Sequence, residues 1–245
     1  MKFVIFSGTT EGRELSRLLA EAGAPVTVCV ATEYGSEEQG STPGVEVCQG
    51  PLSPEEKAEL LSGAVLCVDA THPYARNISR SVKAACEAAG VQLLRLKRQE
   101  SDLAGAILVE SAAEAAEYLR EREGNVLLTT GTKELKAFAE LPPERLFPRV
   151  LPSCDSIAAC EVLGIPHRNI IAMQGPFSRE MNVATIRQYN IRFVVSKDGG
   201  GPGGFAEKAS AAKETGAELI VIRRPEESGF SFDAVLKQCT TMLSH

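Results

Sequence analysis

The chain alternates along its length between short apolar segments and amphipathic segments, and this alternation constrains its fold more than any other feature. The apolar segments predict strands at residues 2–6, 25–32, 45–49, 64–70, 91–96, 106–110, 125–130, 145–151, 169–173, 192–196 and 218–223. The amphipathic segments predict helices at residues 10–22, 53–63, 74–89, 111–122, 132–140, 153–163, 178–189, 204–215 and 231–243. Strands that alternate with helices predict parallel sheets with helices on both faces.

The number of predicted strands, about eleven, is large for a single open sheet. The chain has 245 residues, which is enough to build two hydrophobic cores. We therefore expect an α/β protein of two doubly wound halves with parallel sheets and a cleft between them. The polar segment at 97–105 predicts the boundary between an N-terminal domain, 1–100, and a C-terminal domain, 101–245.

The composition excludes several classes of partner. A net charge of −6 provides no broad basic surface for nucleic acid. No apolar run approaches the roughly 18 residues of a membrane-spanning helix, and the first residues do not form a signal peptide. The seven cysteines include no CxxC pair, which indicates reduced thiols in a cytoplasmic protein. The histidines lack the spacing of metal ligands, so we expect a small-molecule ligand and no metal, nucleic-acid or membrane partner.

Small, polar or glycine-rich segments follow many of the predicted strands. They are Ser7 to Gly12, Thr32 to Gly35, Asp69 to Tyr74, Thr129 to Thr132, Gln174 to Ser178 and Lys197 to Gly201. In open α/β sheets, ligands bind beyond the carboxyl ends of the strands, at the point where the strand order reverses. The loops at the opposite ends of the strands are plainer, and this asymmetry predicts a shared binding crevice.

The first strand is followed by the sequence SGTTEG. Gly8 allows a sharp turn out of the strand, and the backbone amides of Thr9 to Gly12 would point toward a phosphate at the start of a helix. The segment is not a GxGxxG motif, because only Gly8 and Gly12 are present. It predicts a phosphate site, and the alternative is an ordinary strand-to-helix turn with a threonine cap.

Glu33 follows the second strand, about twenty residues after the first turn. An acid at that place commonly binds the ribose 2′-hydroxyl of NAD and disfavours the 2′-phosphate of NADP. The alternative is a solvated acid in a loop.

The sequence DATHPYA follows the strand at 64–70. Proline disfavours the α conformation of the residue before it, so His72 should lie on an extended tip with a helix starting after it. The alternative is a structural histidine that is hydrogen-bonded at the strand end. Asp69 would orient the His72 ring or cap the helix. The chain has no GxSxG motif, which argues against nucleophilic catalysis.

The glycine-rich segment at 199–204 follows Lys197 and Asp198. It predicts a backbone that approaches a ligand closely, with Lys197 as a cation. The alternatives are a flexible loop and a salt bridge between Lys197 and Asp198 without a catalytic role.

Seven motifs taken together resemble the precorrin-6A reductases of cobalamin biosynthesis, including the cobalt-precorrin-6A reductases. In chain order they are GTTEGREL, VATEYG, DATHPYA, RVLPS, GPFSREMN, SKDGGG and VIRRP. The resemblance implies a two-domain Rossmann-like fold. It also implies hydride transfer from a reduced nicotinamide nucleotide to one double bond of the macrocycle, which gives precorrin-6B or its cobalt complex.

The resemblance also implies roles for particular residues. The expected cofactor-binding residues are Ser7, Gly8, Thr9, Thr10, Glu11, Thr32, Glu33, Thr71, His72 and Pro73, and the expected catalytic residues are Thr71, His72 and Tyr74. The expected substrate-binding residues are Arg76, Thr130, Gly131, Gly175, Pro176, Phe177, Ser178, Lys197, Asp198, Gly199 and Gly200. The cofactor expected for the family is NADPH, and Glu33 leaves NADH open. A tetrapyrrole substrate and a monomer or small homo-oligomer are expected.

Two other functions remain open. A nucleotide-sensing module would bind the cofactor without turnover, but it would not need the polar loops of the second half. A transferase of the same architecture would use a nucleotide-sugar or S-adenosylmethionine. The motifs contain no evident nucleophile or general base, which favours hydride transfer over both.

Overall fold

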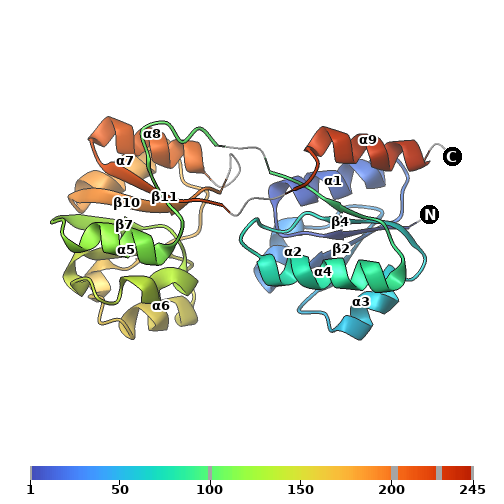
Figure 1. Cartoon of the computed structure of the whole chain (residues 1–245), viewed down its shortest axis with the longest axis horizontal. Coiled ribbons are helices and arrows are strands. Elements are labelled where there is room, and N and C mark those ends of the chain that lie inside the picture. The colour runs from blue at the N-terminus through green and yellow to red at the C-terminus, as the bar shows by residue number, and fades with distance from the viewer. Residues whose placement is uncertain (1, 99–100, 200–203, 225–227, 244–245) are drawn as a thin grey trace. The chain divides into compact units, whose positions relative to one another are not determined.

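The computed structural model describes residues 2–98, 101–199, 204–224 and 228–243. The chain forms two compact units (Figure 1). The first unit comprises Met1–Gln99 together with Pro225–His245, and the second comprises Glu100–Arg224. Each unit is built around one parallel sheet, which confirms the predicted α/β class with two parallel-sheet halves.

The sheet of the first unit contains five strands in the order β3-β2-β1-β4-β5. Their bounds are β1 Lys2–Phe6, β2 Val26–Val30, β3 Val45–Gln49, β4 Ala64–Asp69 and β5 Leu93–Arg95. All neighbouring strands are parallel. The strand order reverses between β1 and β4, because the chain continues from β1 to one edge of the sheet and from β4 to the other.

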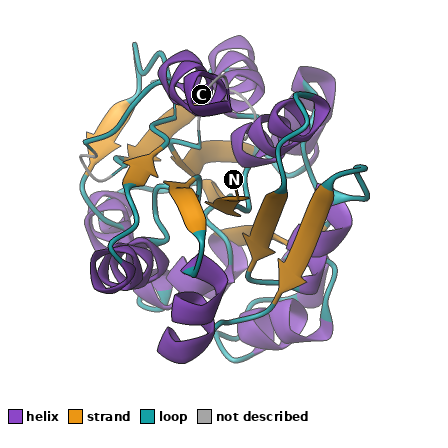
Figure 2. Ribbon diagram, turned by 90° about the vertical axis from the view of Figure 1, so that its right-hand side faces the viewer, coloured by secondary structure: helices purple, strands orange, loops and turns teal. Residues whose placement is uncertain are grey.

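Helices cover both faces of this sheet (Figures 1 and 2). Their bounds are α1 Thr10–Glu21, α2 Glu33–Gln39, α3 Pro54–Leu61, α4 Arg76–Ala89 and α9 Phe232–Leu243. Phe3 and Ile5 of β1 pack in one core with residues of α1 and α9. Val4 and Phe6 point the other way and pack in a second core with residues of α3 and α4. The strand is apolar throughout because alternate residues face two different cores.

The sheet of the second unit contains six strands in the order β6-β11-β10-β7-β8-β9. The strands are β6 Ile107–Val109, β7 Asn125–Leu128, β8 Leu146–Val150, β9 Ile171–Ala172, β10 Ile191–Lys197 and β11 Glu218–Ile222. The helices are α5 Ala112–Arg120, α6 Cys154–Glu161, α7 Arg179–Gln188 and α8 Phe205–Thr215, with 3₁₀ turns at Thr132–Phe138, Pro143–Arg145 and His167–Asn169. The strand order reverses between β7 and β10.

Side-chain caps fix where several helices begin. Thr9 caps α1 by accepting a hydrogen bond from the amide of Gly12 at 3.1 Å. Ser53 and Glu56 form a capping box at the start of α3, with Pro54 at the first helical position. Ser178 caps α7 in the same way as Thr9 caps α1. These starts agree with the sequence because each cap is a local interaction that needs no tertiary contact.

Some elements differ from the prediction. Helix α2 was expected to be a loop, and Thr32 caps its start by accepting from the amide of Gly35. The helix expected at 132–140 is a 3₁₀ turn, Thr132–Phe138. The strand expected at 169–173 contains only Ile171–Ala172. The helix expected at 74–89 begins at Arg76, because a turn occupies the residues before it.

The end of the chain belongs to the first unit, whereas the sequence analysis had placed all of 101–245 in the second. The amide of Phe230 donates to the carbonyl of Arg95, and the amide of Lys97 donates to the carbonyl of Phe230, both at 2.8 Å. Gly229 permits this approach, because a Cβ there would lie 2.7 Å from the Arg95 oxygen. Helix α9 then packs against α1. The pattern of residues 231–243 predicted a helix but carried no information about the sheet that it covers.

Replacing Val235 with alanine should lower the free energy of unfolding by about 2 kcal/mol, because this side chain is fully buried in the core with α1. Urea unfolding followed by circular dichroism measures the change. Val162→Ala is the matched control, because Val162 is 80% exposed and its truncation should leave unfolding unchanged. Equal losses for both variants would contradict the placement of α9 in the core of the first unit.

Candidate active site

The parallel pairing of β1 with β4 brings two predicted site loops together. Phe6 of β1 is in register with Asp69 of β4, so both strands end at the same level. The loop that starts at Ser7 and the loop that starts at Ala70 are therefore neighbours at the reversal of the strand order. This is the position at which ligands bind in open α/β sheets.

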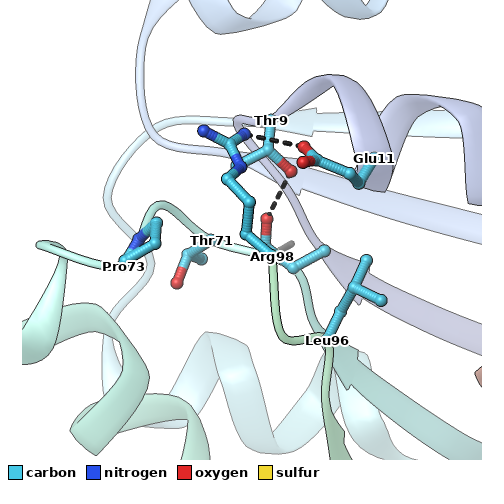
Figure 3. A pocket seen from close by; sticks show the side chains of 7 residues that line it. Thr9, Glu11, Thr71, Pro73, Leu96 and Arg98 are labelled. Atoms are coloured by element: carbon cyan, nitrogen blue, oxygen red, sulfur yellow. Dashed lines mark hydrogen bonds and ion pairs between the residues drawn. The ribbon is translucent and has the colours of Figure 1, made fainter. Parts of the chain in front are cut away.

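Thr9 connects these two loops. Its hydroxyl donates a hydrogen bond to the carbonyl of Ala70 at 2.8 Å and also accepts the capping bond from the amide of Gly12. Figure 3 shows the Thr9 side chain reaching toward the loop that carries Thr71 and Pro73. The single hydroxyl thus fixes the start of α1 to the end of β4.

A small pocket lies at this junction (Figure 3). Its lining residues are Thr9, Glu11, Ala70, Thr71, Pro73, Leu96 and Arg98. Thr9, Glu11, Thr71 and Pro73 are residues that the sequence analysis assigned to the cofactor. The structure brings them together in the first unit.

Ser7 contributes a buried hydroxyl for which the described residues provide no hydrogen-bond partner. A Cβ on Gly12 would lie 2.5 Å from this hydroxyl, so the absence of a side chain at Gly12 leaves room for it. Gly8 has φ +127°, a conformation that favours glycine. The first amides of α1, Thr10 and Glu11, have no partner inside the helix because of helix geometry. Donors without internal partners beside a helix start fit a phosphate.

Asp69 is the centre of a buried network at the end of β4. Its Oδ1 accepts from the Thr71 hydroxyl at 2.7 Å, from the Thr71 amide at 3.0 Å and from Arg95 at 2.7 Å. The hydroxyls of Thr71 and Ser79 lie 3.1 Å apart. The Thr71 hydroxyl hydrogen is therefore already donated to Asp69, so Thr71 holds the loop in position.

Arg98 and Leu96 line the pocket but were not predicted from the sequence. Arg98 is buried and donates to Glu11 at 2.7 Å, as Figure 3 shows. Both residues follow β5, the neighbour of β4 in the sheet. The segment at 97–105 was interpreted as a domain boundary, and the signal that would have identified Arg98 is its place after a strand end.

His72 lies in a turn next to the pocket. The amide of Ala75 donates to the carbonyl of His72 at 2.8 Å, which closes a turn with the buried Pro73 at its second position. The amide of Tyr74 donates to Nδ1 of His72 at 3.4 Å, and the two rings lie 5.5 Å apart. Both side chains are half-buried.

Other predicted residues of the first unit lie at helix starts. Thr10 is exposed at the start of α1, and Arg76 is exposed at the start of α4. Thr32 and Glu33 are exposed at the start of α2, where Thr32 forms the cap. Glu33 therefore begins a helix at the carboxyl end of β2.

The second unit repeats the arrangement between β7 and β10. The hydroxyl of Thr130 is buried with no hydrogen-bond partner among the described residues, and Gly131 has φ +81°. Lys197 pairs with Glu134 at 2.9 Å. Asp198 is buried, accepts from Ser101 at 2.6 Å and pairs with Arg224 at 2.7 Å. Lys197 and Asp198 thus each pair with another residue, rather than with one another.

The loop between β9 and α7 contains four of the predicted substrate residues. Gly175 is followed by Pro176, and a Cβ on Gly175 would lie 2.9 Å from the ring of Phe177. Phe177 packs under the guanidinium of Arg149, and Ser178 caps α7. Gly199 is buried after β10, and Gly200 lies outside the described residues.

Within the described ranges, no helix is long and apolar enough to cross a membrane. The same ranges contain no cluster of three or more histidine, cysteine, aspartate or glutamate residues suited to a metal ion.

Comparison with known proteins gives consistent matches over nearly the whole chain. Residues 2–240 match the family described as Precorrin-6x reductase CbiJ/CobK. The cobalt-precorrin-6A reductase of Priestia megaterium is 35% identical over 231 residues, with 91% of this chain and 90% of the relative covered. The cobalt-precorrin-6A reductase of Salmonella typhimurium is 37% identical over 229 residues, with 91% of this chain and 87% of the relative covered.

A solved structure supports the fold. The chain matches the structure of CobK precorrin-6A reductase with a TM-score of 0.78, covering 98% of this chain and 96% of that one. The sequence identity is 24%, so this similarity concerns the fold.

Replacing Asp69 with alanine should lower the free energy of unfolding by about 3 kcal/mol, because it removes a buried carboxylate that pairs with Arg95 and accepts two hydrogen bonds from Thr71. Chemical unfolding measures the loss. Glu87→Ala is the matched control, since Glu87 forms only an exposed pair with Lys83 at 3.9 Å, and its removal should have no measurable effect. A loss at Asp69 no larger than at Glu87 would contradict the structural role of the network.

Proposed function

The chain belongs to the precorrin-6x reductase CbiJ/CobK family, and from this premise we propose that it transfers a hydride from a reduced nicotinamide nucleotide to one double bond of precorrin-6A or cobalt-precorrin-6A. The product is precorrin-6B or its cobalt complex, an intermediate of cobalamin biosynthesis. The observation that carries the proposal is the family match over residues 2–240, together with relatives named as cobalt-precorrin-6A reductases.

The first unit fits a nucleotide. The unpartnered hydroxyl of Ser7, the space beside Gly12 and the first amides of α1 suit a phosphate. The Thr9 hydroxyl joins the start of α1 to the carbonyl of Ala70, and Glu11 and Arg98 line the pocket beside it. The bound nicotinamide would supply the hydride, so the protein's task is to bind and orient the reactants.

We propose that His72 and Tyr74 hold the macrocycle or the nicotinamide amide near the pocket. His72 is placed by a tight turn, and its Nδ1 accepts from the amide of Tyr74. In the neutral ring, this leaves Nε2 as the donor. Such a donor suits a carboxylate of the macrocycle or a carbonyl oxygen.

The choice between NADPH and NADH belongs to this proposal. NADPH is the cofactor expected for the family, and we propose it here. Glu33 begins α2 at the carboxyl end of β2, where an acid disfavours a 2′-phosphate. A measured preference for NADH over NADPH would indicate that Glu33 disfavours the 2′-phosphate of NADPH.

The direct experiment is a titration of the purified protein with NADPH and NADH, followed by nicotinamide fluorescence, with and without precorrin-6A. Oxidation that depends on the macrocycle is the expected result, and the ratio of the two KM values identifies the cofactor. Binding without turnover would favour a nucleotide-sensing module. Binding of neither nucleotide would favour a transferase that uses another donor.

Replacing Ser7 with alanine should weaken nucleotide binding about fivefold, the contribution of one neutral hydrogen bond. The same change should leave the melting temperature unchanged or raise it, because the buried hydroxyl has no partner among the described residues. Fluorescence titration and thermal unfolding measure the two effects.

Ser16→Ala is the matched control. The Ser16 hydroxyl donates to the carbonyl of Arg13 at 2.7 Å and accepts from Gln39 at 2.9 Å. Its loss should reduce stability and leave nucleotide affinity unchanged. A Ser7 variant that is destabilised and binds the nucleotide normally would contradict the assignment.

Replacing His72 with alanine should reduce kcat/KM for the macrocycle about ten- to hundredfold, without unfolding the protein. Steady-state kinetics and a thermal melt measure the two quantities. His167→Ala is the control, because His167 is largely exposed in the second unit and pairs with Glu161. Loss of the fold in the His72 variant would instead support a structural histidine.

A further inference from the structure

A cluster of charged residues around the buried Arg149 lies in the second unit, outside the residues predicted from the sequence to bind the substrate. It comprises Arg149 near the end of β8 and Lys208 in the first turns of α8, with Glu207 beside Lys208. We call these three residues the Arg149 cluster. Arg149 is 8% exposed, and Lys208 and Glu207 are half-buried.

Arg149 has an unusual environment for a buried arginine. Its guanidinium donates to Oδ1 of Asn182 at 2.8 Å and lies 4.0 Å from the centre of the Phe177 ring. No ion pair joins it to a carboxylate among the described residues. Arg98, which is also buried, pairs with Glu11 at 2.7 Å. A buried guanidinium that contacts only a neutral amide and a ring retains an uncompensated charge.

Asn182 holds the guanidinium in a fixed orientation. Its Nδ2 donates to the carbonyl of Ser178 at 2.8 Å, so its Oδ1 is left to accept from Arg149. Asn182 is 1% exposed. The buried amide and the Phe177 ring therefore position Arg149 and leave its other donors for a further partner.

Lys208 adds a second cation. Burial and the nearby Arg149 charge lower the pKa of Lys208, Glu207 opposes them, and the net result is a pKa of about 8. Burial also lowers the pKa of Arg149 to about 10, so both groups carry charge at neutral pH. Oε2 of Glu207 is buried with no hydrogen-bond partner among the described residues. Two cations and one carboxylate leave one uncompensated positive charge, which a bound anion would neutralise.

The location also indicates a ligand. Arg149 lies at the carboxyl end of β8, Phe177 lies in the loop after β9, and α8 follows β10. All three therefore lie at the carboxyl ends of the strands, which is the side of the sheet where ligands bind in open α/β folds. Phe177 is one of the predicted substrate residues.

We infer that Arg149 and Lys208 bind a carboxylate of the macrocyclic substrate, with Asn182 and Phe177 positioning Arg149. The inference rests on the proposed function, because the many carboxylates of the macrocycle supply the anion. Arginine suits a carboxylate because its planar donors match the two oxygens. The site would fix the orientation of the ring through its periphery and would take no part in hydride transfer.

The test uses the full-length enzyme with Arg149→Met and Lys208→Met. The KM for precorrin-6A should rise about ten- to hundredfold, the expected effect of losing a charged hydrogen bond. The KM for NADPH should stay within about twofold of the unchanged protein. Arg149→Lys keeps the charge and should recover part of the loss. Lys213→Met is the matched control, because Lys213 is exposed on the same helix.

The outcomes separate the inference from the proposed function. If the unaltered protein oxidises neither NADPH nor NADH in the presence of precorrin-6A or cobalt-precorrin-6A, the proposed function fails. If it is active and both methionine variants keep the normal KM for the macrocycle, this inference alone is overturned. A rise in the KM for NADPH instead would assign the anion to a nucleotide phosphate and would also overturn it. If Arg149→Met does not fold, the half-buried Lys208 variant decides.

Discussion

The parallel pairing of β1 with β4 is the constraint on which the candidate site depends. It places the end of β1 beside the end of β4, where the strand order reverses. The hydroxyl of Thr9 then joins the two loops through the carbonyl of Ala70. Because these contacts are made by backbone and short side chains, the loops are positioned by the sheet itself. The pocket, the unpartnered Ser7 hydroxyl and the His72 turn all lie at this junction.

The two units share one structural device. In each, a strand at the reversal is followed or ended by a buried aspartate, Asp69 or Asp198, that pairs with an arginine near the end of the next strand. Each aspartate also accepts from a hydroxyl, of Thr71 or Ser101. These networks fix the loops, while the hydroxyls of Ser7 and Thr130 remain without partners among the described residues. Satisfied groups hold the scaffold, and unsatisfied groups beside them mark where a ligand would bind.

Sequence reasoning predicted the parts of this protein that depend on local pattern. The strands, most helices and the residues at the ends of β1 and β4 were predicted because apolar periodicity and caps are local signals. Helix α2 was missed because residues 33–39 contain no apolar stripe. The docking of α9, the position of Arg98 and the Arg149 cluster were missed because each depends on contacts between distant segments. Arg149 is the first residue of the RVLPS motif, but only the fold shows that it is buried beside Lys208.

The central claim is that this chain catalyses hydride transfer from a nicotinamide nucleotide to the macrocycle. The most direct measurement uses NADPH carrying deuterium at C4 of the nicotinamide and follows the mass of the reduced macrocycle. The account predicts that a deuterium atom from the nucleotide appears in the product. A reduced product without deuterium from either face of the nicotinamide, or no reduction at all, would contradict it.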